Sequence, residues 1–331
     1  MTSASRTRPF AQVDVFSAEP FLGNPVAVVL DGADLTDKQM ARFANWTNLS
    51  ETTFVLPPTS PGADYRLRIF TPDRELPFAG HPTLGSARAW LAAGNTPRGD
   101  VIVQECAAGL VRVHPTDDDA ALAFEAPPTL RSGDLAPDVL EPITTGLGLH
   151  PDQVVAHQWV DNGPGWAALL LRSADEVLAL EPTFAALGAH KVGVLGPAPE
   201  VAEHRFEVRA FVPGAAGYED PVTGSLNAGL AQWLVRTGRA PQDYTARQGT
   251  RMGRRGLVRV SADATGAVRV GGHCTVCVSG SVVLLAPGCT WSSTAGAVSA
   301  PARWAGWNTW TATDGSSCTR GSTRACRSAS A

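Results

Sequence analysis

His81 and Asp220 are the two side chains whose type and setting first suggest chemistry. Each stands directly before a proline that a glycine and a serine soon follow, in HPTLGS and in DPVTGS. An imidazole beside a carboxylate can transfer protons near neutral pH, because the imidazole titrates there and the carboxylate raises its pKa. Taken singly, His81 would be a surface or capping residue and Asp220 an ordinary N-cap. Their paired placement favours an acid/base pair.

The two motifs belong to an internal repeat of the chain. RIFTP at 68–72 and RAFVP at 209–213 precede them, and GLVRV follows twice, at 109–113 and 256–260. Three shared landmarks in the same order indicate two similar halves rather than unrelated domains with coincidental turns. The repeat places His81 and Asp220 at equivalent positions, on opposite walls of a cleft between the halves.

Backbone groups near the same motifs could hold an anion. Each half is expected to enter a helix through its Pro-x-x-Gly-Ser turn, and helix N-termini attract negative charge. The N–H groups around Gly80, Gly85, Gly224 and Ser225 could then bind a carboxylate. The alternative is that these glycines only permit tight turns.

Strand-like runs dominate both halves, and few helices interrupt them. The runs that predict strands in the first half lie near 12–18, 24–30, 52–56, 65–70, 100–106 and 110–113. A capping box of Thr36 and Gln39 predicts one helix, and a second is expected from about Thr83 to Ala93. The expected fold class is α+β, with two pseudo-symmetric barrel-like domains, each wrapped around a central helix.

Composition divides the chain into three parts. The stretch 126–152, rich in proline and glycine, marks a boundary, so we expect barrel-like domains at 1–130 and 131–286. Beyond residue 287 the chain contains no Leu, Ile, Phe, Met or Tyr. Such a segment cannot build an aliphatic core, which predicts a disordered tail over 287–331. A shifted or extended reading frame would produce this kind of tail.

Composition also narrows the class of partner. The 331 residues are 44% hydrophobic and 18% charged with a net charge of −4, as in a globular protein. No cluster of lysine and arginine offers a surface for nucleic acid or for an anionic membrane. No apolar stretch is long enough for a membrane helix, and the N-terminus lacks the apolar region of a signal peptide. We therefore expect a small-molecule partner and a cytoplasmic location.

The cysteines give little support for a metal or redox site. Cys274 and Cys277 form a CxxC, but no second pair accompanies them and the strand-like pattern places them on opposite faces. The six cysteines are also too sparse for a disulfide framework in a chain of this length. Packed, reduced thiols and no metal are expected.

Four segments together resemble the PhzF-like family of phenazine biosynthesis, whose members have the diaminopimelate epimerase fold. They are VDVFSAEPFLGNPVAVVL from Val13, NLSETTFVLPP, RIFTPDRELPFAGHPTLGSA, and YEDPVTGSLNAGLAQWL from Tyr218. The resemblance spans roughly residues 10 to 285. It implies two similar domains, which agrees with the repeat, and a homodimer that works without cofactor or metal.

The resemblance also assigns residues. The catalytic glutamate of the family falls on Glu51 with Ser50 beside it, the GHP histidine on His81, and the EDPVTGS aspartate on Asp220. Gly80, Gly224 and Ser225 correspond to contacts with the substrate carboxylate, and Ser50 is expected to bind the substrate as well. By itself, Glu51 would be read as a solvated residue at the start of a strand.

These residues lead to a functional hypothesis. The resemblance implies an isomerase or epimerase that moves a proton on a small cyclic carboxylic acid, with Glu51 as base and then acid. Burial and the like charge of Asp220 should raise the pKa of Glu51 toward neutrality. The alternatives are a non-catalytic binding protein with the same cleft and, less favoured, hydrolysis by paired carboxylates.

Overall fold

The computed structural model describes residues 5–116, 118, 120–214 and 217–285. The tail expected over 287–331 lies outside the described residues. The described residues belong to one unit of the chain. The domain boundary expected between residues 130 and 131 stays a prediction.

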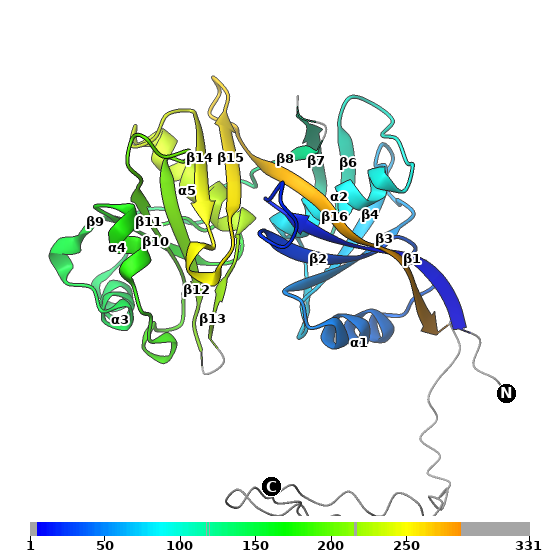
Figure 1. The fold of residues 1–331 in the computed structure, drawn as a ribbon, viewed down its shortest axis with the longest axis horizontal. Coiled ribbons are helices and arrows are strands. Elements are labelled where there is room, and N and C mark those ends of the chain that lie inside the picture. The colour runs from blue at the N-terminus through cyan, green and yellow to red at the C-terminus, as the bar shows by residue number, and fades with distance from the viewer. Residues whose placement is uncertain (1–4, 117, 119, 215–216, 286–331) are drawn as a thin grey trace, which may run out of the picture. The chain divides into compact units, whose positions relative to one another are not determined.

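Strands supply most of the described structure and join into one connected sheet (Figure 1). In the first half they are β1 (Ser5–Val15), β2 (Asn24–Val29), β3 (Glu51–Leu56), β4 (Tyr65–Phe70), β5 (Glu75–Leu76), β6 (Ile102–Cys106), β7 (Gly109–Pro115) and β8 (Ala121–Glu125). In the second half they are β9 (Val154–Trp159), β10 (Trp166–Leu171), β11 (Lys191–Pro197), β12 (Phe206–Val212), β13 (Tyr218–Asp220), β14 (Asp243–Gln248), β15 (Gly256–Ala262) and β16 (Val268–Leu285).

The helices are fewer, as the sequence predicts. They are α1 (Asp37–Thr47), α2 (Gly80–Ala92), α3 (Pro137–Leu147), α4 (Ala174–Ala179) and α5 (Gly224–Arg236). The capping box expected at α1 is present, with Thr36 and Gln39 each accepting a hydrogen bond from the backbone N–H of the other. Helix α2 begins three residues earlier than expected. Pro82 falls in its first turn, where the missing N–H of proline leaves no helical hydrogen bond unmade.

Each half of the sheet surrounds one helix. In the first half the strands run in the order β1-β2-β3-β4-β6-β7-β8-β16, and β1 also pairs with β16, which closes a barrel around α2. The order continues through β15-β14-β12-β11-β10-β9, and α5 packs against β10, β15 and β16. The long strand β16 belongs to both halves (Figure 1). The expected α+β class, with one helix inside each half, is confirmed.

The internal repeat is visible in matching crossovers. β4 and β6 are parallel neighbours joined through α2, and β12 and β14 are parallel neighbours joined through α5. Both helices contain 13 residues. An equivalent ion pair precedes each helix: Arg68 holds both carboxylate oxygens of Glu75, and Arg209 holds both of Glu219. The two halves therefore repeat the same local structure, an arginine–glutamate pair followed by a helix of equal length.

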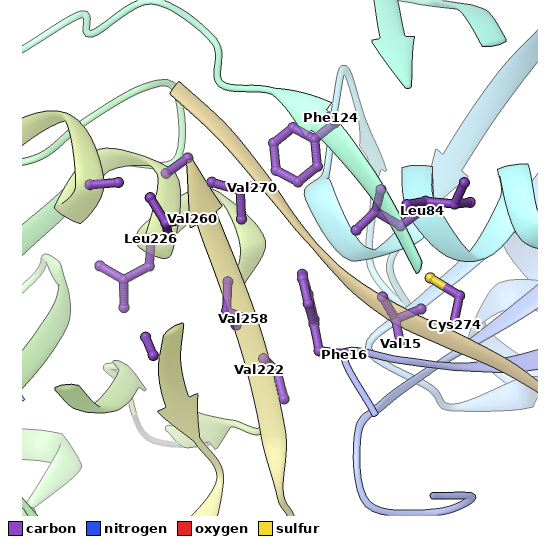
Figure 2. Packing of buried hydrophobic residues seen from close by; sticks show 14 of the residues in the cluster. Val15, Phe16, Leu84, Phe124, Val222, Leu226, Val258, Val260, Val270 and Cys274 are labelled. Atoms are coloured by element: carbon purple, nitrogen blue, oxygen red, sulfur yellow. The ribbon is translucent and has the colours of Figure 1, made fainter. Parts of the chain in front are cut away.

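A shared apolar core joins the two halves. Phe16, Leu84 and Phe124 from the first half belong to the same buried cluster as Val222 and Leu226 from the second. Figure 2 shows these side chains on both sides of β15 and β16. Burial of this cluster fixes the positions of α2 and α5 through the hydrophobic effect. Within the described ranges, no helix has the length and apolar character needed to cross a membrane.

The first residues of α2 and α5 touch. A Cβ built on Gly80 would lie 3.1 Å from the Cα of Gly224 and 2.8 Å from the ring of Phe124. Both distances are shorter than ordinary van der Waals contacts. Glycine is therefore required at position 80 for the two helices to approach this closely.

We expect Gly80→Ala to lower the free energy of unfolding by about 1–3 kcal/mol, because the methyl group forces α2 away from α5 and Phe124. Gly99→Ala is the matched control, since nothing lies within 4 Å of its Cβ position. The control should change stability by less than about 0.5 kcal/mol. Urea denaturation followed by circular dichroism measures both, and equal stabilities would contradict the proposed packing constraint.

Candidate active site

Glu51 and His81 face each other where β3 and α2 begin. Their side chains are 15% and 6% exposed, and Oε2 of Glu51 lies 3.2 Å from Nε2 of His81. Neither of these two atoms makes a hydrogen bond in the described structure. Buried polar atoms without partners are rare and costly. This pair is therefore open to a ligand or to proton exchange.

The imidazole of His81 is held between three neighbours. Nδ1 lies 3.3 Å from the amide nitrogen of Asn24, and Nε2 faces the carboxyl of Glu51 at 3.2 Å. The ring also interacts with the backbone of Pro25. Burial lowers the pKa of His81 to about 3, opposed by the bond to Pro25. The expectation that a carboxylate keeps His81 titrating near neutral pH is thus wrong, because desolvation dominates.

Glu51 is the group that titrates near neutral pH. Burial, and after it the negative charge of Asp220, raise its pKa to about 8, and the charge of Lys191 opposes them. The direction and both causes agree with the sequence expectation. At pH 7 Glu51 is mostly a neutral acid, and it faces Nε2 of His81.

Asp220 is fixed by two donors. Thr223 Oγ1 donates to its Oδ2 over 2.6 Å, and Asn24 Nδ2 donates to its Oδ1 over 3.1 Å. Burial raises the pKa of Asp220 to about 6, and the bonds from Thr223 and Asn24 oppose the rise. Asp220 is therefore mostly ionised at pH 7, when Glu51 is mostly protonated.

Asn24 connects the two halves at this point. Besides Asp220, its Nδ2 donates to the carbonyl of Val222 over 2.9 Å and lies 3.3 Å from Nδ1 of His81. Its side chain is fully buried at the start of β2. His81 and Asp220 therefore lie at a common site, but they are not in direct contact. The amide of Asn24 lies between them.

Both central helices begin without a side-chain cap. Ala79 has none to offer, and Thr223 donates its hydroxyl to Asp220 instead. The N-termini abut, since a Cβ on Gly224 would lie 3.3 Å from the backbone nitrogen of His81. Uncapped N–H groups of two converging helices favour a bound anion. This arrangement supports the carboxylate contacts expected at Gly80, Gly224 and Ser225.

Ser225 and Ser50 differ in their surroundings. The hydroxyl of Ser225 accepts a hydrogen bond from Nε1 of Trp166 over 3.1 Å, and its carbonyl accepts one from Asn162 over 2.9 Å. Ser50 is partly buried directly before Glu51, and its role in substrate binding stays a prediction.

The register of the repeat needs one correction. Aligning the helix starts and the preceding ion pairs makes Gly80 the counterpart of Gly224 and His81 the counterpart of Ser225. Asp220 lies four residues before α5, at the end of β13. His81 and Asp220 are therefore not equivalent by position. The sequence alignment matched the proline, glycine and serine of the two motifs. These residues lie at different distances from the helix start in the two halves.

Sequence reasoning missed several polar neighbours of the site. Asn24 lies in one of the segments that resemble the family, but the sequence assigns it no role. Its amide at the start of an apolar strand is the feature of the sequence that could have indicated one. Gln248 donates to the carbonyl of Asp220 and to Thr223 Oγ1, both over 3.0 Å, from the distant strand β14. Lys191, whose charge acts on both carboxyls, also lay outside the motifs.

A separate cavity of about 360 Å³ does not include these residues. It lies beside Phe16, Leu257, Thr245 and the ion pairs of Arg255. Those pairs with Glu19 and Glu203 already neutralise Arg255. The candidate site is therefore placed at Glu51 and His81 and not at this cavity.

The cysteines of the CxxC are free thiols in the described structure. Cys274 is buried, and burial raises its pKa to about 12; burial also raises the pKa of Cys277. Thiols with raised pKa values are poor nucleophiles. These values agree with the packed thiols expected, and the absence of a metal stays a prediction.

Comparison with known proteins shows the family. The model of the phenazine biosynthesis-like protein family matches residues 13–285, so the chain belongs to this family. Antisense-enhancing sequence 1 of Schizosaccharomyces pombe is 39% identical over 82% of this chain and 97% of its own. Trans-2,3-dihydro-3-hydroxyanthranilate isomerase of Pseudomonas aeruginosa is 34% identical over 80% of this chain and 95% of its own.

A solved structure supports the fold. The PhzF-family phenazine biosynthesis protein of Bacillus anthracis matches with a TM-score of 0.72 and 21% identity, over 84% of this chain and 99% of the other. Together with the named isomerases among its relatives, the family places this chain among the isomerases and epimerases.

The raised pKa of Glu51 predicts how stability depends on pH. A folded-state pKa of about 8, against 4.5 when unfolded, means that the native state holds this proton more tightly. The contribution of Glu51 is present below pH 4.5 and is lost as pH rises through 8. We expect Glu51→Gln to be more stable than wild type at pH 8.5, by roughly 2–5 kcal/mol at about 1.4 kcal/mol per pKa unit. Urea denaturation at pH 5 and 8.5 tests this, and an advantage independent of pH would contradict it.

Asn24 should hold the pKa of Asp220 down. Asn24→Ala removes a donor that favours the ionised carboxylate, so the pKa of Asp220 should rise above about 6. A carbon-detected NMR titration of the aspartate carboxyl groups measures the shift. An unchanged or lowered pKa would contradict this role of Asn24.

Proposed function

We propose that the protein is a cofactor-independent isomerase or epimerase that moves a proton on a small cyclic carboxylic acid through acid/base catalysis by Glu51. The observation that carries the proposal is the contact of Glu51 with His81. A carboxyl with a pKa of about 8 lies 3.2 Å from Nε2 of a neutral imidazole, beside two uncapped helix N-termini. A general base works best with a pKa near the operating pH.

The proposed reaction begins with the ionised form of Glu51. The substrate carboxylate binds the N–H groups at Gly80 and Gly224 together with Ser225. The Glu51 carboxylate takes a proton from a carbon next to an unsaturated system, and the electron pair delocalises into that system. The resulting carboxylic acid returns the proton to another carbon, so the atoms and charge of the substrate are conserved.

The neighbours of Glu51 have distinct proposed roles. Nε2 of His81 accepts the hydrogen of protonated Glu51 between the two transfers and so keeps the carboxyl oriented. Asp220 stays ionised and raises the pKa of Glu51, which makes the acid form available for the return step. A similar division between two carboxyls recurs in enzymes that tune pKa values by environment.

The substrate class is proposed from one relative. The Pseudomonas aeruginosa relative is named for trans-2,3-dihydro-3-hydroxyanthranilate, a cyclic unsaturated carboxylic acid. We propose a substrate of the same general kind, without assigning phenazine formation, since related sites serve different reactions. A homodimer and a cytoplasmic location remain part of the proposal, and sedimentation at several concentrations tests the dimer.

The alternative of a non-catalytic binding protein predicts a different arrangement. It is favoured by an exposed Glu51 or by one that points away from His81. Glu51 is only 15% exposed and faces His81, so the enzyme is the better-supported proposal.

We expect Glu51→Gln to lower proton exchange by about 10²–10⁴-fold, because an amide cannot accept and return the proton. The assay incubates protein in heavy water with trans-2,3-dihydro-3-hydroxyanthranilate and other unsaturated cyclic carboxylates, and NMR follows deuterium entering C–H positions. Glu200→Gln is the control at an exposed position and should keep wild-type exchange. Full exchange by Glu51→Gln would refute the assignment, whereas binding without exchange by wild type would favour the binding protein.

A further inference from the structure

Lys191 stands beside the candidate site without a role in the proposed reaction. It begins β11 and lies opposite Trp166 of the parallel strand β10. Its Nζ lies over the Trp166 ring, 5.6 Å from the centroid. The Nε1 of the same indole donates to Ser225 Oγ over 3.1 Å. One indole ring thus separates the ammonium group from the N-terminus of α5.

Among the described residues, the ammonium group of Lys191 forms no close ion pair. Lys191 is partly buried, and no carboxylate oxygen of those residues lies within 4.0 Å of its Nζ. A partly desolvated cation is costly unless it is paired, and the indole face compensates only in part. The position is therefore suited to an anion that arrives with a ligand.

The charged side chains around Lys191 also favour an anionic ligand. It acts electrostatically on both Glu51 and Asp220, which places it within reach of the reacting groups. Arg74, from the first half of the chain, repels it, while Asp161 attracts it from the second half. Asp161 already accepts hydrogen bonds from the N–H groups of residues 163 and 165. A ligand anion would relieve the repulsion between the two cations.

We propose that Lys191 binds a second anionic group of the substrate, so that the preferred substrates are dicarboxylic acids or carboxylic acids with another acidic group. The first carboxylate is held at the N-termini of α2 and α5, in contact with Ser225 at the edge of the indole. The second lies over the face of the same indole, at the ammonium group. This inference rests on the proposed function for the place of the first carboxylate.

Binding of simple aromatic acids tests the proposal without requiring turnover. Calorimetric titration compares benzoate with the three benzenedicarboxylates (phthalate, isophthalate and terephthalate). Wild type should bind at least one diacid tenfold or more tightly than benzoate. Lys191→Met keeps the stem over Trp166 but removes the charge, so it should lose this preference while its affinity for benzoate changes less than twofold.

The controls separate charge from packing. Lys38→Met removes the only other lysine, at an exposed position of α1, and should keep the preference. Lys191→Arg should keep most of it, and Lys191→Gln should lose it, which covers the case in which Lys191→Met fails to fold. Thermal denaturation of every variant checks folding.

Two results would overturn the proposal. One is a wild-type protein that binds no diacid tenfold better than benzoate, and the other is a folded Lys191→Met or Lys191→Gln that keeps the preference. Its failure differs from failure of the proposed function. Proton exchange that survives in Glu51→Gln refutes the reaction even if diacids are preferred, and loss of exchange in Glu51→Gln upholds the reaction even if they are not.

Discussion

The close contact between the first residues of α2 and α5 is the constraint on which the site depends. Gly80 and Gly224 approach so closely that a Cβ on either would lie 3.1 Å from the Cα of the other. This contact brings together the uncapped N–H groups of the two helices, and His81 follows directly after Gly80. A shared core of apolar side chains from both halves holds the helices there (Figure 2). Helix packing, backbone polarity and the candidate chemistry thus meet at one pair of glycines.

Asn24 contributes to the difference in pKa between the two buried carboxyl groups of the site. Asp220 and Glu51 are both buried and both have raised pKa values, to about 6 and about 8. Asp220 receives hydrogen bonds from Asn24 and Thr223, whereas Oε2 of Glu51 receives none. Donors favour the ionised form, so the proton resides on Glu51 near neutral pH. Two acids of the same kind thereby hold different states because their neighbours differ.

The sequence predicts the scaffold better than it predicts the site. The repeat, the first-half strands, the capping box before α1 and the α+β class follow from local patterns, which local structure obeys. The pKa of His81 could not follow, because it depends on burial by residues distant in the chain. Nor could the roles of Asn24 and Gln248, whose partners lie between 21 and 198 positions away. Turn residues also misaligned the two halves, since proline and glycine mark turns without fixing their distance from a helix.

The corrected register shows that the repeat duplicates the scaffold and not the chemistry. Each half has the same arginine–glutamate pair, the same crossover and a helix that begins with glycine. The next residue is His81 in one half and Ser225 in the other. His81 faces a carboxyl that can carry a proton, whereas the hydroxyl of Ser225 accepts a hydrogen bond from the indole of Trp166. Symmetric packing therefore surrounds the two helix N-termini with different side chains. That asymmetry suits the proposed reaction, in which a single group both removes and returns a proton.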